Sequence, residues 1–168
     1  DLGRMVMAVA KDLDGITDYP WGCGRFERQY PPYIERMLAI SDSPTSLGVC
    51  ASLGQEIRLI DDIDDRFPVA REALERTNVF LHMDEVDEYS HQKDPPKKVR
   101  VLEHIDRKME EYFSDIDRIV YFVDHGTSSV TGNHIITKVP FWTSFETSIG
   151  QDEHVELKDA IPRIMGSQ

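Results

Sequence analysis

The chain has 168 residues, of which 40% are hydrophobic and 30% are charged. That length is enough for one domain that buries roughly 68–70% of the surface its unfolded chain exposes, and the composition is that of an ordinary soluble globular protein. The formal net charge of −12 argues against binding to nucleic acid or to an anionic membrane, because both would need clustered Lys and Arg. A phosphorylated substrate is still compatible with this charge, since bound cations can supply a local positive field.

Residues 1–35 contain the turn-forming runs Tyr19–Gly24 and Tyr30–Pro32, so we predict a loop-rich N-terminal segment there. We predict an α/β domain over residues 36–168. From residue 36 on, apolar runs typical of strands alternate with helix-like runs. The expected strands are Met37–Ile40, Glu56–Ile60, Val79–Met83 and Ile119–Val123, with a fifth inside Ile135–Trp142.

Helix-like runs separate these strands. A short helix is expected at Thr45–Gly54, closed by its glycine, and another at Pro68–Arg76. The clearest helix begins at Pro95, with Asp94 as its N-cap. Strands separated by helices indicate a mostly parallel sheet with helices on both faces and right-handed crossovers. Apolar residues recur every three or four positions along the clearest helix: Val99, Leu102, Ile105, Met109 and Tyr112.

Five polar residues are predicted to form a site for two divalent cations. Asp87 and His91 lie four residues apart in DEYSH, after the third expected strand. Asp124 and His125 end the fourth expected strand, and His134 stands nine residues further on. Ligands of a parallel sheet gather beyond the carboxyl ends of its strands, where a rigid scaffold can fix their geometry. Carboxylates and neutral imidazoles suit manganese or zinc.

Each part of this pattern has a plain structural alternative. The acidic segment MDEVDEYSH could be a solvated loop, Asp124 could cap a helix with Thr127 in its first turn, and His134 could be an ordinary loop histidine. The dense negative charge around Asp87 is nevertheless unfavourable unless solvent or a cation offsets it. The metal site therefore depends on all five residues occurring together.

Several of these stretches together resemble the cofactor-independent phosphoglycerate mutases of archaeal type, which belong to the alkaline phosphatase superfamily. The segment NVFLHMDEVDEYSH carries the DExxH pattern, and KV and LEHID follow it at Lys98 and Leu102. A DH pair then precedes Thr and Ser, and a histidine stands six residues before Pro140. SDSPTSLGVCASLGQEIRL fits the preceding strand, helix and strand, and WGCG is a weaker match. The resemblance covers residues 20–145 and is specific over 78–141.

The resemblance implies an alkaline phosphatase-like fold, partial in this chain, with two manganese or zinc ions. It implies that Asp87, His91 and His134 hold one ion and that Asp124 and His125 help to hold the other. The reaction it implies interconverts 3-phosphoglycerate and 2-phosphoglycerate, a step of glycolysis and gluconeogenesis, through a phosphorylated Ser or Thr.

Two basic residues, Arg25 and Lys98, are candidates for contacts with the phosphate or carboxylate of a small phosphorylated substrate, although each could equally be solvated. In the family, the phosphate-accepting Ser or Thr and one further metal-binding Asp come from the N-terminal portion. This chain begins after both, so no nucleophile is identified. We expect the C-terminal portion of a longer enzyme, inactive alone because the covalent step needs its nucleophile. Its expected partner is that N-terminal half or a second copy of the chain.

The setting expected for the protein is the reducing cytoplasm. Cys23 and Cys50 form neither a CxxC pair nor a disulfide framework. No apolar run reaches the ~18 residues of a membrane span, and no basic signal-peptide start is present.

Other functional classes are compatible with parts of the sequence. Asp12–Thr17 with the DH pair is similar to the DHH phosphoesterases, but DHG stands where that family has DHH. Asp61–Asp65 is similar to the DDxxD of terpene synthases, but those are all-helical, so we interpret it as a solvated loop. A non-catalytic metal-binding or partner-binding module, or another phosphoesterase of the alkaline phosphatase superfamily, is also consistent with the ligands.

Overall fold

The structure is a computed structural model that describes residues 36–151 and 153–165. All of these belong to one compact unit, residues 32–168. The loop-rich segment predicted for residues 1–35 lies outside the described residues, so that prediction and the boundary at residue 36 stay predictions.

The central sheet is parallel, as the sequence predicts. It contains β1 (Met37–Ser41), β2 (Glu56–Leu59) and β3 (Asn78–Leu81) in the order β2-β1-β3, and both pairings are parallel. The middle strand has Leu38 and Ile40 with no exposed surface. An uninterrupted apolar run is what a parallel strand covered on both faces requires.

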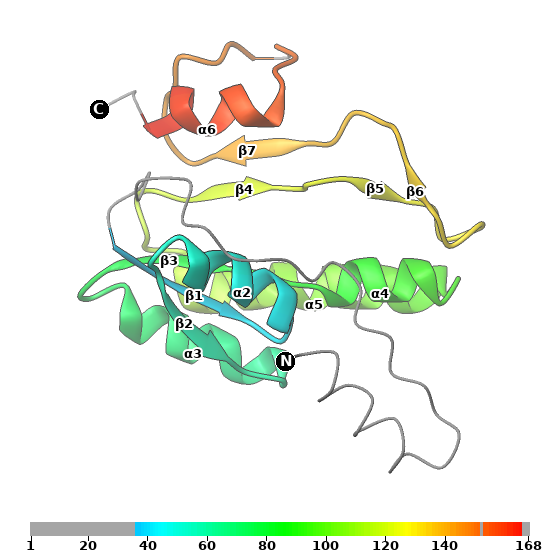
Figure 1. Cartoon of the computed structure of the whole chain (residues 1–168), viewed down its shortest axis with the longest axis horizontal. Coiled ribbons are helices and arrows are strands. Elements are labelled where there is room, and N and C mark those ends of the chain that lie inside the picture. Colours follow the sequence, from blue (N-terminus) through cyan, green and yellow to red (C-terminus); the bar gives the residue numbers. More distant parts are fainter. Residues whose placement is uncertain (1–35, 152, 166–168) are drawn as a thin grey trace, which may run out of the picture. The chain divides into compact units, whose positions relative to one another are not determined.

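Helices cover both faces of this sheet (Figure 1). The chain passes from β1 outward to β2 through α2 (Pro44–Ser52), and back across β1 to β3 through α3 (Ile63–Ala73). Because these two crossovers run in opposite directions, their common right-handedness places α2 and α3 on opposite faces. Ser43 caps α2, and Gly54 follows it with a φ of 82°, a conformation that favours glycine. The α/β fold class is confirmed.

Helix α3 begins earlier than predicted. Its N-cap is Asp62, whose carboxylate accepts a hydrogen bond of 2.9 Å from the backbone N–H of Asp64. Asp64 and Asp65 then occupy the first turn, where acidic side chains interact favourably with the positive end of the helix dipole. The interpretation of this acidic run as a solvated loop was therefore wrong. Pro68, predicted at the helix start, lies inside the helix.

Two helices follow β3. The segment interpreted as an acidic loop forms α4 (Glu85–His91), which contacts α5 (Pro95–Phe113). Helix α5 begins as predicted, because the carboxylate of Asp94 accepts a hydrogen bond of 3.0 Å from the backbone N–H of Lys97. Ile105, Met109 and Tyr112 of α5 pack with α3 against the sheet. Val99 and Leu102, which were predicted to share this apolar side, are 53% and 38% exposed, so the predicted stripe is wrong at these two residues. The buried core consists of Leu38, Ile40, Phe67, Ala70, Ala73, Ile105 and Phe113.

The remaining strands are short and antiparallel. β4 (Val120–Phe122) pairs with β7 (Phe141–Thr143), and β5 (Gly126–Thr127) pairs with β6 (His134–Ile135). The range Ile135–Trp142, in which a fifth strand was expected, contains the end of β6 and the start of β7 instead of one continuous strand, and the two have different partners. Pro140 lies between them and has no backbone N–H to donate to a ladder.

Within the described ranges, β4 forms no ladder with the parallel sheet. It contacts β3 through the stacked rings of Phe80 and Phe122, whose centroids are 6.3 Å apart. The last helix, α6 (Leu157–Met165), packs on β4 and β7 through Ala160 and Ile164. No helix in the described part of the chain has the length and apolar character needed to cross a bilayer.

Candidate metal centre

Helix α4 supplies two of the predicted ligands. Asp87 and His91 are four residues apart, so they project from the same face of the helix. The Nε2 atom of His91 lies 3.0 Å from Oδ2 of Asp87. The helix follows directly from the carboxyl end of β3. The predicted position beyond a strand end is therefore confirmed, although the segment is helical.

The β5–β6 hairpin supplies the predicted histidines that come later in the chain. His134 pairs with Thr127 across the two strands, and His125 immediately precedes β5. The rings of His125 and His134 have centroids 3.9 Å apart. Gly126 stands between His125 and Thr127 in the chain, and a Cβ there would lie 2.5 Å from Cγ2 of Thr137, so any larger residue would force that side chain to move. The sequence prediction that the backbone approaches closely at this glycine is confirmed.

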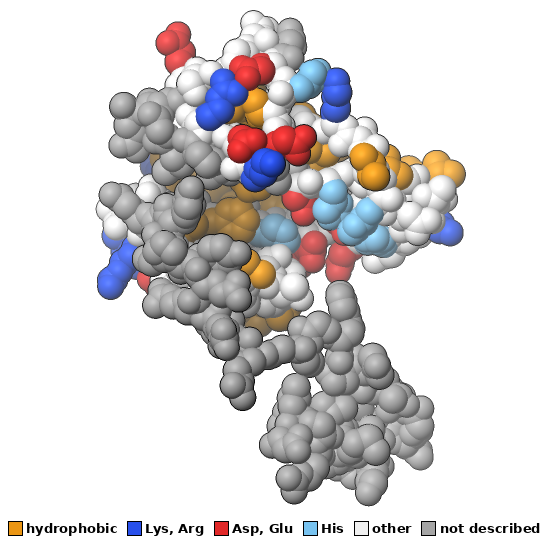
Figure 2. All heavy atoms as spheres, turned by 45° about the horizontal axis from the view of Figure 1, so that its top comes forward, with side chains coloured by type: hydrophobic (Ala, Val, Ile, Leu, Met, Phe, Trp, Pro, Cys, Tyr) orange, Lys and Arg blue, Asp and Glu red, His pale blue; other side chains and the backbone are white. Residues whose placement is uncertain are grey.

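The helix and the hairpin meet at one point. Nε2 of His134 lies 3.1 Å from Nε2 of His91 and 3.8 Å from Oδ2 of Asp87. Asp87, His125 and His134 can each place one ligand atom within 4.8 Å of the others. Figure 2 shows histidine and acidic side chains gathered on one face of the molecule. Four of the five predicted ligands thus converge, although they lie up to 47 residues apart in the chain.

Hydrogen bonds orient the imidazole rings toward this point. Nδ1 of His91 is 2.8 Å from the carbonyl oxygen of Gly132, which can only accept, so this nitrogen carries a proton. The hydroxyl of Thr127 donates to Oδ1 of Asp87 and therefore accepts from Nδ1 of His125, 3.2 Å away. In the neutral rings of His91 and His125, the lone pair is then on Nε2. Such outer hydrogen bonds are how proteins orient histidines that bind metals.

The atoms of this cluster are close enough to share one cation. The Nε2 lone pair of His91 faces a carboxylate oxygen of Asp87 at 3.0 Å and a ring nitrogen of His134 at 3.1 Å. Either a proton on an imidazole nitrogen or a bound cation offsets the repulsion among these electron-rich atoms. Around a tetrahedral zinc ion with Zn–N bonds of ~2.0–2.1 Å, ligand atoms are about 3.3 Å apart. The observed separations of 3.0–3.8 Å bracket this value, so the donor set fits a divalent cation.

Further acidic groups lie near Glu88, which follows Asp87 in α4. The pKa of Glu88 is raised, first by burial and then by the negative charges of Asp42, Asp84, Glu85 and Asp87. A raised carboxyl pKa means that the charged form is disfavoured where negative charge is already concentrated. A bound cation would relieve this repulsion.

Asp124 lies at the edge of the cluster rather than inside it. Its side chain is 66% exposed, and its Oδ2 is 3.4 Å from Nε2 of His125. Its other carboxylate oxygen accepts a hydrogen bond from the backbone N–H of His125. Because His125 also contacts His134, the two predicted ligand sets adjoin each other. Their division between two ions stays a prediction.

The predicted substrate contacts are only partly described. Lys98, on α5, donates a hydrogen bond of 3.2 Å from Nζ to the carbonyl oxygen of Thr127. Its ammonium group therefore lies beside the hairpin that carries the histidines, and its contact with substrate stays a prediction. Arg25 lies outside the described residues.

Sequence reasoning missed two residues that support the site. Thr127 was grouped with a helix start, but it lies in β5, and side chains two residues apart in a strand point to the same side. The two-residue spacing of His125 and Thr127 was the signal in the sequence that could have identified Thr127. Gly132 has a φ of 72° and presents its carbonyl to His91. The Gly-Asn dipeptide there was a turn signal.

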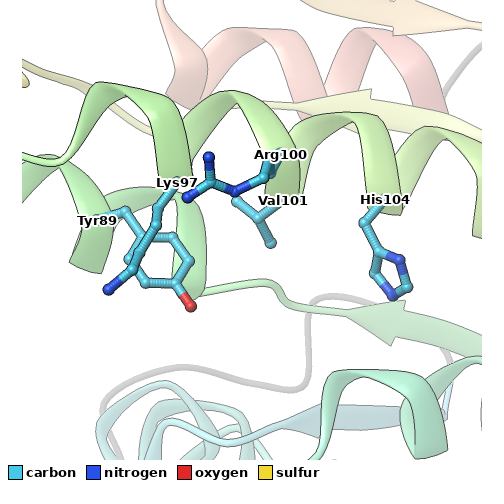
Figure 3. A pocket seen from close by; sticks show the side chains of 5 residues that line it. All are labelled: Tyr89, Lys97, Arg100, Val101 and His104. Carbon is cyan, nitrogen blue, oxygen red and sulfur yellow. The ribbon is translucent and has the colours of Figure 1, made fainter.

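An open pocket lies elsewhere, along α4 and α5 (Figure 3). Its described lining includes none of the predicted ligands, and two of its basic groups already have acidic partners, at Asp94 and Asp64. The side chains of His91 and His134 are 45% and 56% exposed, so the candidate metal centre lies at the surface of the described part of the chain. The pocket is lined by Tyr89, Lys97, Arg100, Val101 and His104.

Known proteins are similar to this chain in sequence or in fold. The model of the Metalloenzyme superfamily matches residues 51–166. A 2,3-bisphosphoglycerate-independent phosphoglycerate mutase from Picrophilus torridus is 25% identical over 126 residues, which cover 68% of this chain and 31% of that protein. The PH0037 protein from Pyrococcus horikoshii superposes with a TM-score of 0.59 at 22% identity, over 64% of this chain and 32% of that one. The chain thus spans about a third of the length of each.

Proposed function

This chain belongs to the Metalloenzyme superfamily, and we propose that it provides the metal-binding part of a phosphoryl-transfer site of the phosphoglycerate mutase type. The observation that carries the proposal is the convergence of His91, His134 and Asp87 on one point, at 3.0–3.8 Å. The name of the Picrophilus relative supports the reaction class. Because the chain spans about a third of that relative, the activity of the whole protein is part of the proposal.

In this proposal, Asp87, His91 and His134 hold one divalent cation, manganese or zinc. His125 and Asp124 contribute to a second. Bound cations supply positive charge that stabilises phosphoryl oxygens and lowers the pKa of a nucleophilic hydroxyl. The ligand atoms named here are carboxylate oxygens and imidazole nitrogens, which both metals accept.

The chain's other residues orient these ligands and the substrate. Thr127 and Gly132 hold Asp87 and the imidazole rings by hydrogen bonds. The ammonium of Lys98, beside the same hairpin, is placed to contact a phosphate or carboxylate. Thr127 is buried, with 9% of the residue exposed, and its hydroxyl already donates to Asp87, so it is not the phosphate acceptor. We assign that role to another segment of the enzyme or to a partner chain.

The proposed substrate is 3-phosphoglycerate, converted to 2-phosphoglycerate in the cytoplasm. A small substrate with two anionic groups, a carboxylate and a phosphate, approaches a chain of net charge −12 against general repulsion. Local cations must therefore dominate the field at the site. The metal ions are in this sense part of substrate recognition as well as of the reaction.

Metal titration tests the proposal directly. The chelator-treated chain would be titrated with Mn²⁺ and Zn²⁺ by calorimetry, beside His91→Ala and the control His104→Ala. His104 lies on α5 and pairs with Asp64 at 2.7 Å, away from the cluster. We expect binding to the wild type, much weaker binding to His91→Ala, and unchanged binding to the control. Equal affinity in all three proteins would exclude the site.

A second measurement separates the mutase from a non-catalytic metal-binding module. Conversion of 3-phosphoglycerate would be followed by ³¹P NMR with the chain and with any longer gene product that contains it. The mutase proposal predicts metal-dependent conversion by the longer protein, lost in its His91→Ala variant. Metal binding without conversion by either protein would favour the non-catalytic module.

A further inference from the structure

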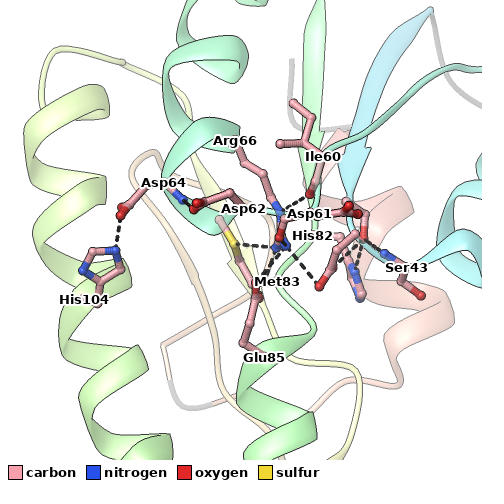
Figure 4. A network of polar contacts seen from close by, with 12 residues as sticks. Ser43, Ile60, Asp61, Asp62, Asp64, Arg66, His82, Met83, Glu85 and His104 are labelled. Atoms are coloured by element: carbon pink, nitrogen blue, oxygen red, sulfur yellow. Dashed lines mark hydrogen bonds and ion pairs between the residues drawn. The ribbon is translucent and has the colours of Figure 1, made fainter.

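A fully buried arginine lies beyond the carboxyl ends of the three parallel strands. Arg66, on α3, has no exposed surface. Its Nε donates a hydrogen bond of 2.8 Å to the carbonyl oxygen of Ile60, and one terminal nitrogen donates at 2.8 Å to that of Asp61 (Figure 4). The guanidinium thus holds the backbone that leaves β2.

The same group bridges two carboxylates from different segments. Asp42, which follows β1, lies 3.0 Å from Arg66, and Glu85, the first residue of α4, contacts it at 2.8 Å and 3.1 Å. These carboxylates are 22% and 14% exposed. The planar guanidinium offers its donors in a fixed fork, so these contacts fix direction as well as distance.

The contact between Arg66 and Glu85 is relevant to the metal centre, because Glu85 begins the helix that carries two of the candidate ligands. Asp87 and His91 lie two and six residues further along α4. The helix has seven residues, and among the described contacts its N-cap, Asp84, makes no capping side-chain hydrogen bond. Helices shorter than ~12–15 residues are marginal by themselves. The placement of α4 therefore depends on tertiary contacts, and Arg66 provides the charged one at its start.

Stability alone is a poor explanation for this arrangement. A buried ion pair gives little net stability, because desolvation of the charges offsets their attraction, and apolar residues of similar volume often do as well. What the arginine provides is a fixed geometry between three strand ends and one helix. We propose that Arg66 is a positioning residue of the metal centre, which holds α4 so that Asp87 and His91 meet His134. This inference rests on the proposed metal site.

The test compares the Mn²⁺ affinity of folded variants by calorimetry. Arg66→Met removes a positive charge, so electrostatics alone would tighten cation binding, whereas loss of positioning weakens it. We expect binding 10- to 100-fold weaker, the range typical of residues that orient metal ligands, with part of the loss restored in Arg66→Lys. The control is Arg71→Met on the same helix, which loses an exposed pair with Asp115 and should bind within about twofold of wild type.

Glu85→Gln provides a second route in case Arg66→Met does not fold, because it leaves the arginine's contacts with Asp42 and the β2 loop in place. Asp84→Asn is its control, since it removes an equal charge next to it but no described capping bond. If Arg66 positions α4, Glu85→Gln should lose more Mn²⁺ affinity than Asp84→Asn. Equal losses of Mn²⁺ affinity in these two variants, or wild-type affinity in folded Arg66→Met or in Glu85→Gln, would overturn the role of Arg66. A wild-type chain that binds no Mn²⁺ would instead overturn the proposed metal site.

Discussion

Replacing Thr127 with valine isolates one hydrogen-bonding group of the metal centre. Valine keeps the shape of threonine but has no hydroxyl. In the structure Thr127 is buried, and its hydroxyl donates to Oδ1 of Asp87 and accepts from Nδ1 of His125. The substitution therefore frees a metal-binding carboxylate and a metal-binding ring at once, while leaving the packing of the hairpin intact.

Two independent estimates of the effect agree. A hydrogen bond to a charged group contributes about 1.5–3 kcal/mol. Loss of a residue that orients metal ligands typically costs about 10- to 100-fold in affinity, which at about 1.4 kcal/mol per tenfold is about 1.4–2.8 kcal/mol. We therefore expect Thr127→Val to raise the dissociation constant for Mn²⁺ or Zn²⁺ by one to two orders of magnitude.

The assay is calorimetric titration of the chelator-treated protein. The matched control is Thr143→Val in β7, apart from the cluster, which removes a hydroxyl that donates to the carbonyl oxygen of Phe145. The control should bind as the wild type does. If Thr127→Val also bound with wild-type affinity, the hydroxyl would not orient the ligands and the reasoning on this hydrogen-bond chain would be refuted.

Three further predictions concern other parts of the structure. Gly132→Ala places a Cβ 2.9 Å from the carbonyl oxygen of His91 at a φ of 72°. It should cost about 1–2 kcal/mol in urea unfolding and weaken metal binding; unchanged values would contradict the turn geometry. Phe67→Ala should lower the free energy of unfolding by about 3–5 kcal/mol, because the ring is fully buried; a loss below about 1 kcal/mol would contradict that packing. Arg163 lowers the pKa of Glu153 to about 2, so any stability from this pair is present above pH 4.5 and is lost as the pH falls toward 2. An NMR titration should find that value, and in Arg163→Met a pKa nearer 4.5; an ordinary pKa in the wild type would count against the ion pair.

The sequence predicted the fold where local signals and burial agree. The apolar run of β1 and the Asp94-Pro95 start of α5 were located correctly, because a central parallel strand and a capped amphipathic helix have distinctive patterns. The start of α3 was missed because Asp62–Asp65 is also what a solvated loop looks like. Only the capping hydrogen bond distinguishes the two. The antiparallel pairing of β4 and β7 depends on long-range contacts that no local pattern contains.

The sequence predicted the candidate metal ligands but not the residues that hold them in place by hydrogen bonds and ion pairs. The spacing of Asp87 and His91 and the DH pair were visible, since ligands of fixed chemical type recur in order along the chain. Thr127 and Gly132 were not identified, because a hydroxyl and a backbone carbonyl become meaningful only when the hairpin places them beside an imidazole. The contacts of Arg66 are invisible in the sequence for the same reason, since its partners come from three segments.

The most direct test of the account is the position of a bound metal ion. A crystal of the chain soaked in Mn²⁺ would be examined by anomalous scattering at the manganese edge. The account predicts a peak within coordination distance of His91 Nε2, His134 Nε2 and a carboxylate oxygen of Asp87, at ~2.0–2.2 Å as for bound zinc. A map with no peak among these three atoms, or with manganese held only at other residues, would contradict the account.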